Sequence, residues 1–218
     1  MAQRTQLNPN LPANYFRKYD ETPDDEFYRS ARLVVHIDDP AIAATTALFR
    51  EVLPPGGAIL DLMSSWRSHL PGLGTATDVA YSRVAGQGMN ETELKQNPQL
   101  TDYIVQNLNQ NPTLPYKDGE FDGCVMTVSV QYLTQPVAVF REVARVLKPG
   151  SPFITVFSNR MFPTKAVAVW QALDDAGHAE LVETYYDQTG LFMDIRTHDR
   201  SPNPGQSDPL FATVGYRK

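Results

Sequence analysis

The 218-residue chain lacks the features of an extracellular or membrane-embedded protein. Its single cysteine, Cys124, excludes an intramolecular disulfide, and its place in an apolar run indicates a structural thiol in a reducing compartment. No stretch contains about 18 consecutive apolar residues, the length that a membrane span needs. The N-terminal stretch also has no apolar signal core. We therefore expect a soluble, cytoplasmic protein with no membrane partner.

Positive charge is also scarce. Lys and Arg number 19 against 25 Asp and Glu, which gives a formal net charge of -6. Such a chain offers no basic field for phosphate backbones, so a nucleic acid is not expected as the main partner. With 42% hydrophobic and 20% charged residues, the composition is that of a single globular domain, either a monomer or a homodimer.

Several ligand-binding motifs are missing. The sequence has no P-loop, no H-E-x-x-H motif and no Cys/His cluster, so neither a P-loop nucleotide site nor a metal site is expected. The dinucleotide fingerprint G-x-G-x-x-G does not follow the first predicted strand. The candidate pair Gly72 and Gly74 comes about ten residues too late, which disfavours a nicotinamide cofactor.

What the chain does contain is an alternation of short apolar runs and amphipathic segments. Asp39-Pro40, a capping carboxylate followed by proline, predicts the start of a helix. A second helix is predicted over 136–147, and a third from Thr164 to Gly177, which would leave His178 at the surface. Strands are predicted at 58–63, 83–89, 102–108, 121–129, 152–158, 191–200 and 210–218.

This order of elements indicates an α/β fold. Strands that are apolar almost throughout and alternate with helices are typical of a parallel sheet covered on both faces. The last two strands have no helix between them, so one of them must run antiparallel to its neighbour. Residues 1–39, which are polar, aromatic and acidic, are expected to form a cap that contributes to an acceptor pocket on the core of residues 40–218.

The block FDGCVMTVSVQYLTQPVAVFREVARVLKPG, residues 121–150, resembles the class I S-adenosylmethionine-dependent methyltransferases, in particular their small type-11-like members. It matches a fourth strand with its acidic residue at Asp122 and a helix that ends in the string from Arg145 to Gly150. The resemblance covers roughly residues 40–218. It implies a Rossmann-like, seven-stranded, mostly parallel sheet with helices on both faces and a C-terminal antiparallel hairpin strand. It also implies S-adenosyl-L-methionine as cofactor and S-adenosyl-L-homocysteine as product.

The turn after the first strand departs from this family, in which it is rich in glycine. Asp61 holds the acidic position, but Met63, Ser64, Ser65 and Trp66 replace the glycines. Larger side chains should hold the backbone farther from a ligand. Serine hydroxyls and backbone N–H groups can nevertheless bind a carboxylate. Retained binding and weakened or re-oriented cofactor binding therefore both stay open.

The next strand ends depart as well. The acidic residue that binds the ribose in this family matches Asn90, after Met89, so the contact would survive without charge assistance. Glu91 or Glu93 would supply the carboxylate if the register shifts. The resemblance places the remaining cofactor contacts after the third strand and at the end of the fourth, on Asn107, Leu108, Asn109, Met126 and Thr127.

Methyl transfer from a sulfonium is an in-line displacement, in which the protein positions the nucleophile and excludes water. A base is needed only when the acceptor must lose a proton. His36 is the candidate base and Tyr132 a second catalytic candidate, although His36 could equally pack beside the helix start. The expected acceptor contacts are Tyr28, His69, Gln131 and Arg160, of which His69 could instead brace the preceding turn.

These expectations favour an enzyme that transfers a methyl group from S-adenosylmethionine to a small-molecule acceptor. The intact block of residues 121–150 supports this interpretation. The alternative is a catalytically weak or inactive protein of the same fold that acts as a ligand-binding or regulatory partner. The altered glycine turn and Asn90 favour that alternative, and the sequence leaves the acceptor and its methylated atom open.

Overall fold

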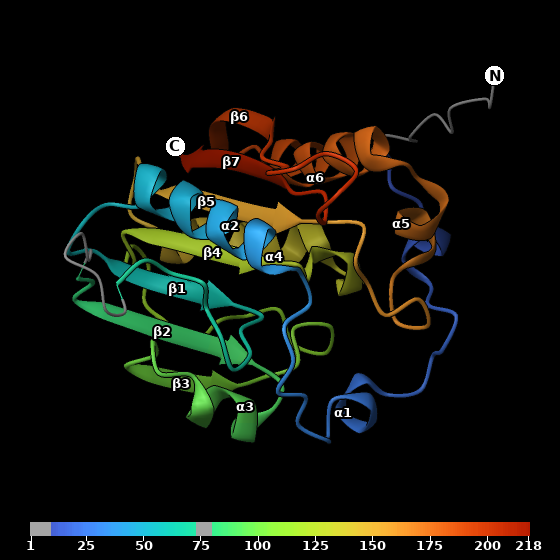
Figure 1. The fold of residues 1–218 in the computed structure, drawn as a ribbon, viewed down its shortest axis with the longest axis horizontal. Coiled ribbons are helices and arrows are strands. Elements are labelled where there is room, and N and C mark those ends of the chain that lie inside the picture. The colour runs from blue at the N-terminus through green and yellow to red at the C-terminus, as the bar shows by residue number, and fades with distance from the viewer. Residues whose placement is uncertain (1–9, 73–79) are drawn as a thin grey trace.

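The computed structural model describes residues 10–72 and 80–218 (Figure 1). Gly74, half of the late glycine pair, lies outside these residues. One seven-stranded sheet has the order β3-β2-β1-β4-β5-β7-β6. Strands β1 to β5 pair in parallel, whereas β7 is antiparallel to both β5 and β6. The strands are β1 (Ala58–Leu62), β2 (Arg83–Gly88), β3 (Asp102–Val105), β4 (Gly123–Thr127), β5 (Pro152–Phe157), β6 (Phe192–Asp199) and β7 (Phe211–Arg217).

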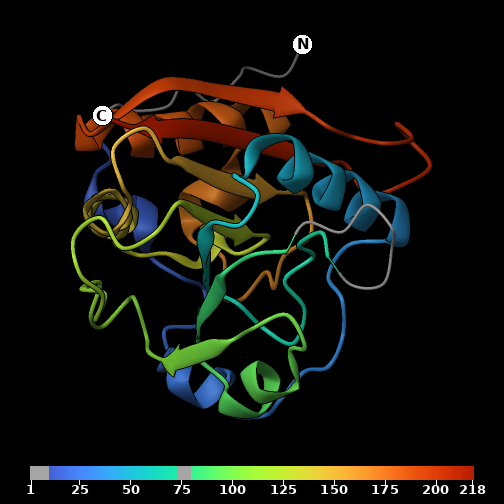
Figure 2. The same ribbon diagram turned by 90° about the vertical axis from the view of Figure 1, so that its left-hand side faces the viewer.

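Helices cover both faces of this sheet, which confirms the predicted fold class. Helix α2 (Asp39–Val52) lies on one face, and α4 (Pro136–Val146) and α6 (Asp175–Thr189) lie on the other (Figures 1 and 2). None of the helices in the described ranges is long and apolar enough to cross a membrane. The shorter elements are η1 (Ala13–Phe16), α1 (Asp24–Phe27), α3 (Glu91–Gln96), η2 (Val130–Tyr132) and α5 (Ala168–Ala172).

Two hydrophobic cores lie on opposite sides of the sheet, because successive strand residues point to opposite faces. Ile59, Val125 and Ile154 pack with Leu48 and Phe49 of α2. On the other face, Leu60, Cys124 and Phe153 pack with Phe140 of α4 and with Tyr185 and Tyr186 of α6. Burial on both faces explains why the strands are apolar almost throughout. It also raises the pKa of the only thiol, as expected for a structural cysteine.

The predicted third helix is wrong at both ends, because α5 begins after Val167 and not at Thr164. Helix α5 ends at Ala172, and α6 begins after Asp174, whose carboxylate accepts a hydrogen bond from the Gly177 backbone N–H. Gly177 therefore lies in the first turn of a helix and does not end one. The inward face of α6 has regular helical spacing and consists of His178, Leu181, Val182, Tyr185 and Tyr186.

His178 is buried, so its predicted surface position is also wrong. Its ring stacks on Trp170 with centroids 4.0 Å apart, and its Nε2 lies 2.8 Å from the Trp170 carbonyl oxygen. Burial lowers the pKa of His178 and favours the neutral ring. The error follows from interpreting a glycine near an N-cap as a helix C-terminus.

Two helix starts differ in smaller ways from the sequence prediction. Helix α2 is capped by Asp38, one residue earlier than expected, because Asp38 Oδ1 accepts from Ala41 N at 3.1 Å. Helix α3 was not predicted. It begins after Asn90, whose Oδ1 accepts from Glu93 N at 3.1 Å, so this asparagine has a structural role as an N-cap.

The N-terminal segment, residues 10–38, runs along the edge of the sheet where the arrows of β1, β2 and β4 end (Figure 1). A fully buried cation fastens it there. Lys165 Nζ donates to the carbonyl oxygens of Asp20 and Thr22 and lies 3.7 Å from Asp24 Oδ1. Lys18 pairs with the same aspartate at 2.7 Å. The segment is therefore held by buried charge as well as by apolar packing.

Replacement of this cation should destabilise the protein strongly. Lys165→Ala is expected to lower the free energy of unfolding by about 3–5 kcal/mol, because it leaves buried Asp24 with one cation fewer. Arg17→Ala is the control, since it removes an exposed ion pair with Glu21 in the same segment and should change little. Urea unfolding measures both variants, and equal losses would contradict the proposed role of Lys165.

Candidate functional site

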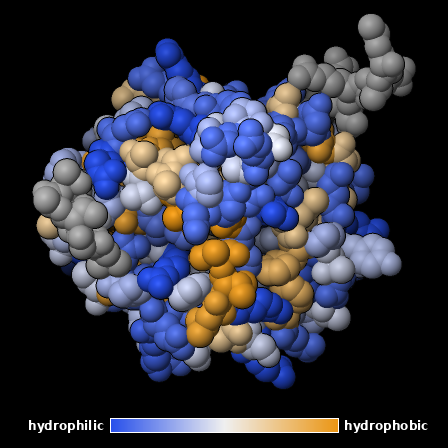
Figure 3. All heavy atoms as spheres, viewed as in Figure 1, coloured by the Kyte–Doolittle hydropathy of each residue, from blue (hydrophilic) through white to orange (hydrophobic). Residues whose placement is uncertain are grey.

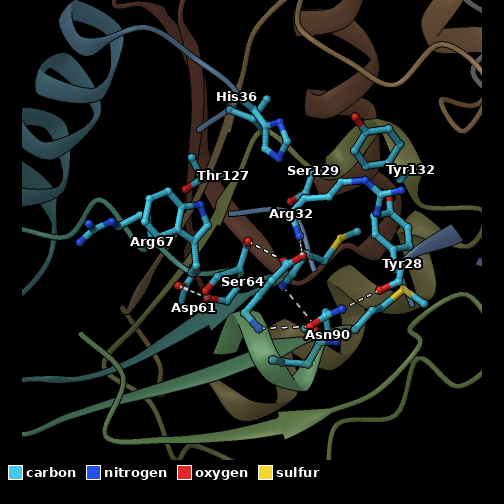
Figure 4. A pocket seen from close by; sticks show the side chains of 18 of the residues that line it. Tyr28, Arg32, His36, Asp61, Ser64, Arg67, Asn90, Thr127, Ser129 and Tyr132 are labelled. Carbon is cyan, nitrogen blue, oxygen red and sulfur yellow. Dashed lines mark hydrogen bonds between the residues drawn. The ribbon is translucent and has the colours of Figure 1, made fainter. Parts of the chain in front are cut away.

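A cavity lies at the carboxyl ends of β1, β2 and β4. The strand order changes direction between β1 and β4, and ligands of open α/β sheets bind at such a point. Figure 4 shows side chains from these strand ends and from the N-terminal segment converging there. The predicted site residues that line the cavity are Tyr28, His36, Asp61, Met63, Ser64, Ser65, Trp66, His69, Met89, Asn90, Asn107, Leu108, Asn109, Thr127 and Tyr132.

The other three predicted site residues lie elsewhere. Met126 is fully buried in the hydrophobic core. Gln131 is also buried, and its Nε2 donates to the carbonyl oxygens of Val128 and Arg160 at 3.1 Å each. Arg160 lines a second cavity that adjoins the first. Met126 and Gln131 therefore support the wall of the site from behind.

The turn after β1 is held against β2 through its backbone. Ser64 N donates to the Gln87 carbonyl oxygen at 2.6 Å, and Met63 N donates to Gln87 Oε1 at 3.0 Å. A Cβ at Gly88 would lie 2.3 Å from the Ser64 carbonyl oxygen, so no side chain fits at that position. The glycine that this close approach requires is therefore on β2 and not in the turn itself.

The side chains of the turn tie it to its surroundings. Ser64 Oγ donates to Asp61 Oδ2 at 2.6 Å, and Ser65 Oγ donates to Glu93 Oε2 at 2.7 Å. Trp66 Nε1 donates to the Val34 carbonyl oxygen at 2.8 Å and so joins the turn to the N-terminal segment. The two serines thus act first as braces, and the backbone N–H groups of Met63 and Ser64 are already bonded to Gln87.

Asp61 is buried beneath this turn, with 3% of its surface exposed. Burial raises the pKa of Asp61 from an ordinary 3.8 to about 7, although hydrogen bonds with Ser64 and Ser68 oppose the shift. The carboxyl group therefore changes charge near neutral pH, directly behind the part of the cavity that the turn encloses.

At the end of β2, the three candidate ribose contacts differ in their environment. Asn90 Nδ2 donates to the carbonyl oxygens of Tyr28 and Arg29 at 2.9 and 3.1 Å, so its amide holds the N-terminal segment. Glu93 lines the same cavity and accepts from Arg32 N at 2.7 Å. Glu91 is instead paired with Lys95 on the surface of α3. Glu93 is therefore the carboxylate that the fold brings to the cavity.

The segment after β3 is joined to the N-terminal segment in the same way. Asn107 Nδ2 donates to Asp25 Oδ1 at 3.0 Å, and Asn109 Nδ2 donates to Asp24 Oδ2 at 2.9 Å. Leu108, between them, is 3% exposed. The two asparagines thus hold residues 24–37, which form a cover over the cavity, and the buried leucine supplies an apolar wall.

This cover exposes apolar side chains, two of which, Val34 and Val35, also line the cavity. Leu33, Val34 and Val35, between α1 and α2, are 43 to 53% exposed. Figure 3 shows apolar surface beside hydrophilic surface on the face of the molecule that this segment crosses. The cover is therefore amphipathic, with its polar backbone groups bonded inward to strand ends.

The end of β4 presents polar groups that the described part of the chain leaves without partners. Thr127 Oγ1 and Ser129 Oγ are buried and have no hydrogen-bond partner there, and both residues line the cavity. Val128 between them has φ 48°, a strained value for a β-branched residue. Strain and unpaired polar atoms in one wall mark this wall as the place where a ligand would make hydrogen bonds.

His36 and Tyr132 meet at Phe162. The His36 ring packs edge-on to Phe162 with centroids 5.3 Å apart, and burial lowers the pKa of His36. Tyr132 Oη accepts from Phe162 N at 2.8 Å, and burial raises the pKa of Tyr132 to about 12. The imidazole is therefore neutral and able to take a proton, while the phenol keeps its own. His69 is also neutral, since burial lowers its pKa to about 4.

The sequence interpretation missed Arg32, Phe162, Gln87 and Gly88, all of which line the cavity. Arg32 carries its guanidinium 4.3 Å from the Phe27 ring centroid and 5.5 Å from that of Phe162. The glycines in the second strand were the available signal. Glycine inside a strand often marks a close backbone approach, and here it accommodates the turn.

Comparison with known proteins agrees with this geometry. Residues 69–155 match the methyltransferase domain family. The biotin biosynthesis bifunctional protein BioHC of Teredinibacter turnerae is 30% identical over 102 residues, which is 43% of this chain and 18% of that protein. The chain thus spans less than a fifth of the length of this curated relative.

Two solved structures illustrate the similarity in fold. The S-adenosylmethionine-dependent methyltransferase from Mesorhizobium loti has a TM-score of 0.55 and 17% identity, with 80% of this chain and 98% of that chain covered. Phosphoethanolamine N-methyltransferase 2 of Haemonchus contortus, in complex with S-adenosyl-L-methionine, has a TM-score of 0.55 and 14% identity. The coverage is 80% of this chain and 52% of that chain.

The sheet order, the position of the cavity and the matched segment define a methyltransferase domain of Rossmann-like fold. Residues 69–155 carry the matched methyltransferase domain, and the fold is that of the S-adenosylmethionine-dependent methyltransferases. This confirms the resemblance found in the block of residues 121–150.

Substitution at Gly88 should displace the turn. A Cβ there would meet the Ser64 backbone oxygen, whereas a Cβ at Gly86 of the same strand would meet only the flexible end of Leu100, at 2.4 Å. Gly88→Ala is therefore expected to lose about 1–3 kcal/mol more free energy of unfolding than the control Gly86→Ala. Urea unfolding compares them, and a larger loss in the control would refute the close approach.

The buried carboxyl group predicts a pH-dependent stability. Since the pKa of Asp61 is raised to about 7, the folded protein keeps a proton that the unfolded chain releases above its ordinary 3.8. The native state binds more protons in this window, so this group removes stability as the pH rises from about 4 to 7. The slope is at most about 1.4 kcal/mol per pH unit.

Asp61→Asn keeps an acceptor for Ser64 but cannot ionise, and so should lose this part of the pH dependence. The difference in free energy of unfolding between the variant and the unmodified protein should move in favour of the variant from about pH 4 to 8. Urea titrations across this range measure the difference. A difference that stays constant with pH would mean that Asp61 does not titrate in this window.

Proposed function

We propose that the chain binds S-adenosylmethionine in the cavity and transfers its methyl group to a small-molecule acceptor by in-line displacement. The observation that carries the proposal is the wall at the end of β4. There, the buried hydroxyls of Thr127 and Ser129 are unpaired within the described residues, and both residues line the cavity together with the turn after β1. In a methyltransferase domain this is the crevice at the strand-order switch point.

The residues around the cavity fit such a cofactor. The backbone of Ser65 and Trp66 would take the amino acid end, where Asp61 lies behind the turn. Glu93 keeps lone pairs for ribose hydroxyls after its two bonds to Arg32 and Ser65. Met89 and Leu108 would cover an adenine ring, and Thr127 would supply a hydroxyl. When bound, the cofactor supplies an electrophilic methyl group on a sulfonium that leaves as a thioether.

The remaining residues position and shield the acceptor. Neutral His36 would accept the proton of a nucleophile that has to lose one, and the protonated phenol of Tyr132 would orient it. The cover formed by residues 24–37 would exclude water, because it is bonded to the ends of β2 and β3. A cavity closed in this way suits a small acceptor, and at least one enzyme of similar fold is named for a small molecule, phosphoethanolamine.

The second candidate function is a binding or regulatory protein with the same fold. It is favoured by Asn90, Asn107 and Asn109, whose amide groups are already bonded to the N-terminal segment. Such a protein would bind the cofactor without producing a methylated product. Cofactor binding and methyl transfer therefore have to be measured separately.

Thermal unfolding with S-adenosylmethionine, S-adenosylhomocysteine and NAD tests the binding step. At 100 times its dissociation constant, a bound ligand adds about 2.7 kcal/mol of stability, and we expect this for the two sulfur compounds only. Thr127→Val should weaken their binding about 2- to 12-fold. Thr184→Val, which changes an exposed hydroxyl on α6, is the matched control.

Methyl transfer is tested with methyl-labelled cofactor and a panel of small acceptors. Labelled product is the expected result. Stabilisation by the cofactor without product from any acceptor would favour the binding protein. The absence of stabilisation by either sulfur compound at millimolar concentration would refute both candidates.

A further inference from the structure

A second cavity continues the first toward the outside. Both cavities share one wall, formed by Val35, His36, Ile37, Val128, Tyr132 and Phe162. The second cavity adds four residues from the start of α2, the segment after β5 and the loop before β7. These are Asp38, Arg160, Met161 and Asp208. An acceptor held in the second cavity would reach the first across the wall that contains His36 and Tyr132.

The two carboxylates in this second cavity are already engaged at every oxygen. Asp38 Oδ1 accepts from Ala41 N, and Oδ2 accepts from Asp208 N at 2.9 Å. Asp208 Oδ2 accepts from Asp38 N at 2.9 Å, and Oδ1 accepts from Arg160 Nε at 2.7 Å. Both groups therefore build the frame of the cavity, and each of their four oxygens already accepts one hydrogen bond from the protein.

The guanidinium of Arg160, by contrast, uses only one of its N–H donors within the described residues. Its Nε is bonded to Asp208, whereas Nη1 and Nη2 make no hydrogen bond to any residue that the structure describes. A guanidinium has five N–H donors, so four remain for a ligand. The side chain of Asp208 is 10% exposed and binds the Nε end of the Arg160 guanidinium, while the side chain of Arg160 is 60% exposed.

We propose that the second cavity binds the acceptor through a carboxylate or phosphate held by Arg160, with the methyl-accepting group directed to the shared wall at His36 and Tyr132. This rests on the proposed function, since it names the acceptor class of the same site. A forked guanidinium is well suited to planar carboxylates and to phosphates because it can form two parallel hydrogen bonds.

The walls specify the rest of the acceptor. Tyr132 and Phe162 stack with centroids 6.0 Å apart, and His36 lies edge-on to Phe162. Together with Val35 and Met161 they leave an apolar and aromatic surface between the anion site and the reacting position. The acceptor is therefore a small anion with a flat or apolar body.

The formal charge of the cavity does not contradict an anionic ligand. Asp38 and Asp208 outnumber Arg160, but Asp38 caps the 14-residue helix α2, whose N-terminus carries a partial positive charge. The argument depends on which hydrogen-bonding groups are free. Each carboxylate oxygen already accepts one hydrogen bond, whereas Nη1 and Nη2 of Arg160 donate none to the described residues.

Three probes of similar shape and different charge test the proposal: benzoate, benzamide and benzylamine. Each is titrated calorimetrically into the protein before and after saturation with S-adenosylhomocysteine. We expect benzoate to bind at least about tenfold more tightly than the other two. Arg160→Ala should weaken benzoate binding about 10- to 100-fold, the effect of a lost charged hydrogen bond, and leave benzamide unchanged.

Two further variants keep the test specific. Arg200→Ala, which removes a surface pair with Glu51, should leave every probe unchanged. Asp208→Asn removes a negative charge and should preserve or strengthen benzoate binding. Preferential binding of benzylamine that is lost in Asp208→Asn would overturn the proposal in favour of a cationic acceptor, and equal binding of all three probes would also overturn it.

The two proposals can fail separately in this experiment. Binding of S-adenosylhomocysteine without a preference for benzoate would refute the anion site and keep the proposed function. Binding of benzoate through Arg160 without any binding of S-adenosylhomocysteine would refute methyl transfer and leave an anion site. Failure of both ligands to bind would refute both proposals.

Discussion

The close contact between the turn of residues 63–66 and strand β2 is the constraint on which the rest of the site depends. It exists because Gly88 has no side chain, so that the Ser64 carbonyl oxygen can approach the strand, and because Gln87 accepts hydrogen bonds from two successive amides of the turn. The turn whose larger side chains were expected to hold its backbone farther from a ligand is set back against its neighbouring strand. The glycine that this contact requires lies in β2, while the turn itself carries the larger residues.

This contact also organises the cover of the cavity. With the turn in place, Ser65 reaches Glu93, and Glu93 in turn accepts from the backbone of Arg32. Trp66 binds the backbone of the same segment from the other side of the opening. The N-terminal segment, fastened at its far end by buried Lys165, is thus bonded to the turn and to α3. Its course brings His36 against Phe162 and joins the inner cavity to the outer one that Arg160 borders.

The parts of the protein that depend on local patterns could be predicted from the sequence. The five parallel strands were recognisable as apolar runs, and the block of residues 121–150 carried the family resemblance. Non-local geometry was not accessible in the same way. The sequence shows two glycines in GQG but not that a turn more than 20 residues earlier rests on one of them. Asn90 matched a ribose contact, yet it caps a short helix whose third residue, Glu93, brings the carboxylate to the cavity. Gly177 was misinterpreted because a glycine after an N-cap and a glycine at a helix end have similar local surroundings.

Amide hydrogen exchange with and without S-adenosylhomocysteine tests most directly whether the turn against Gly88 is the cofactor-binding element. The account predicts that the ligand slows exchange at the backbone amides of Ser65 and Trp66, because those of Met63 and Ser64 are already bonded to Gln87. Exchange in β6, the strand at the opposite edge of the sheet from β3, should stay unchanged. Ligand binding that leaves the amides of Ser65 and Trp66 unaffected would contradict the account, because the cofactor would then lie elsewhere and the turn would only be structural.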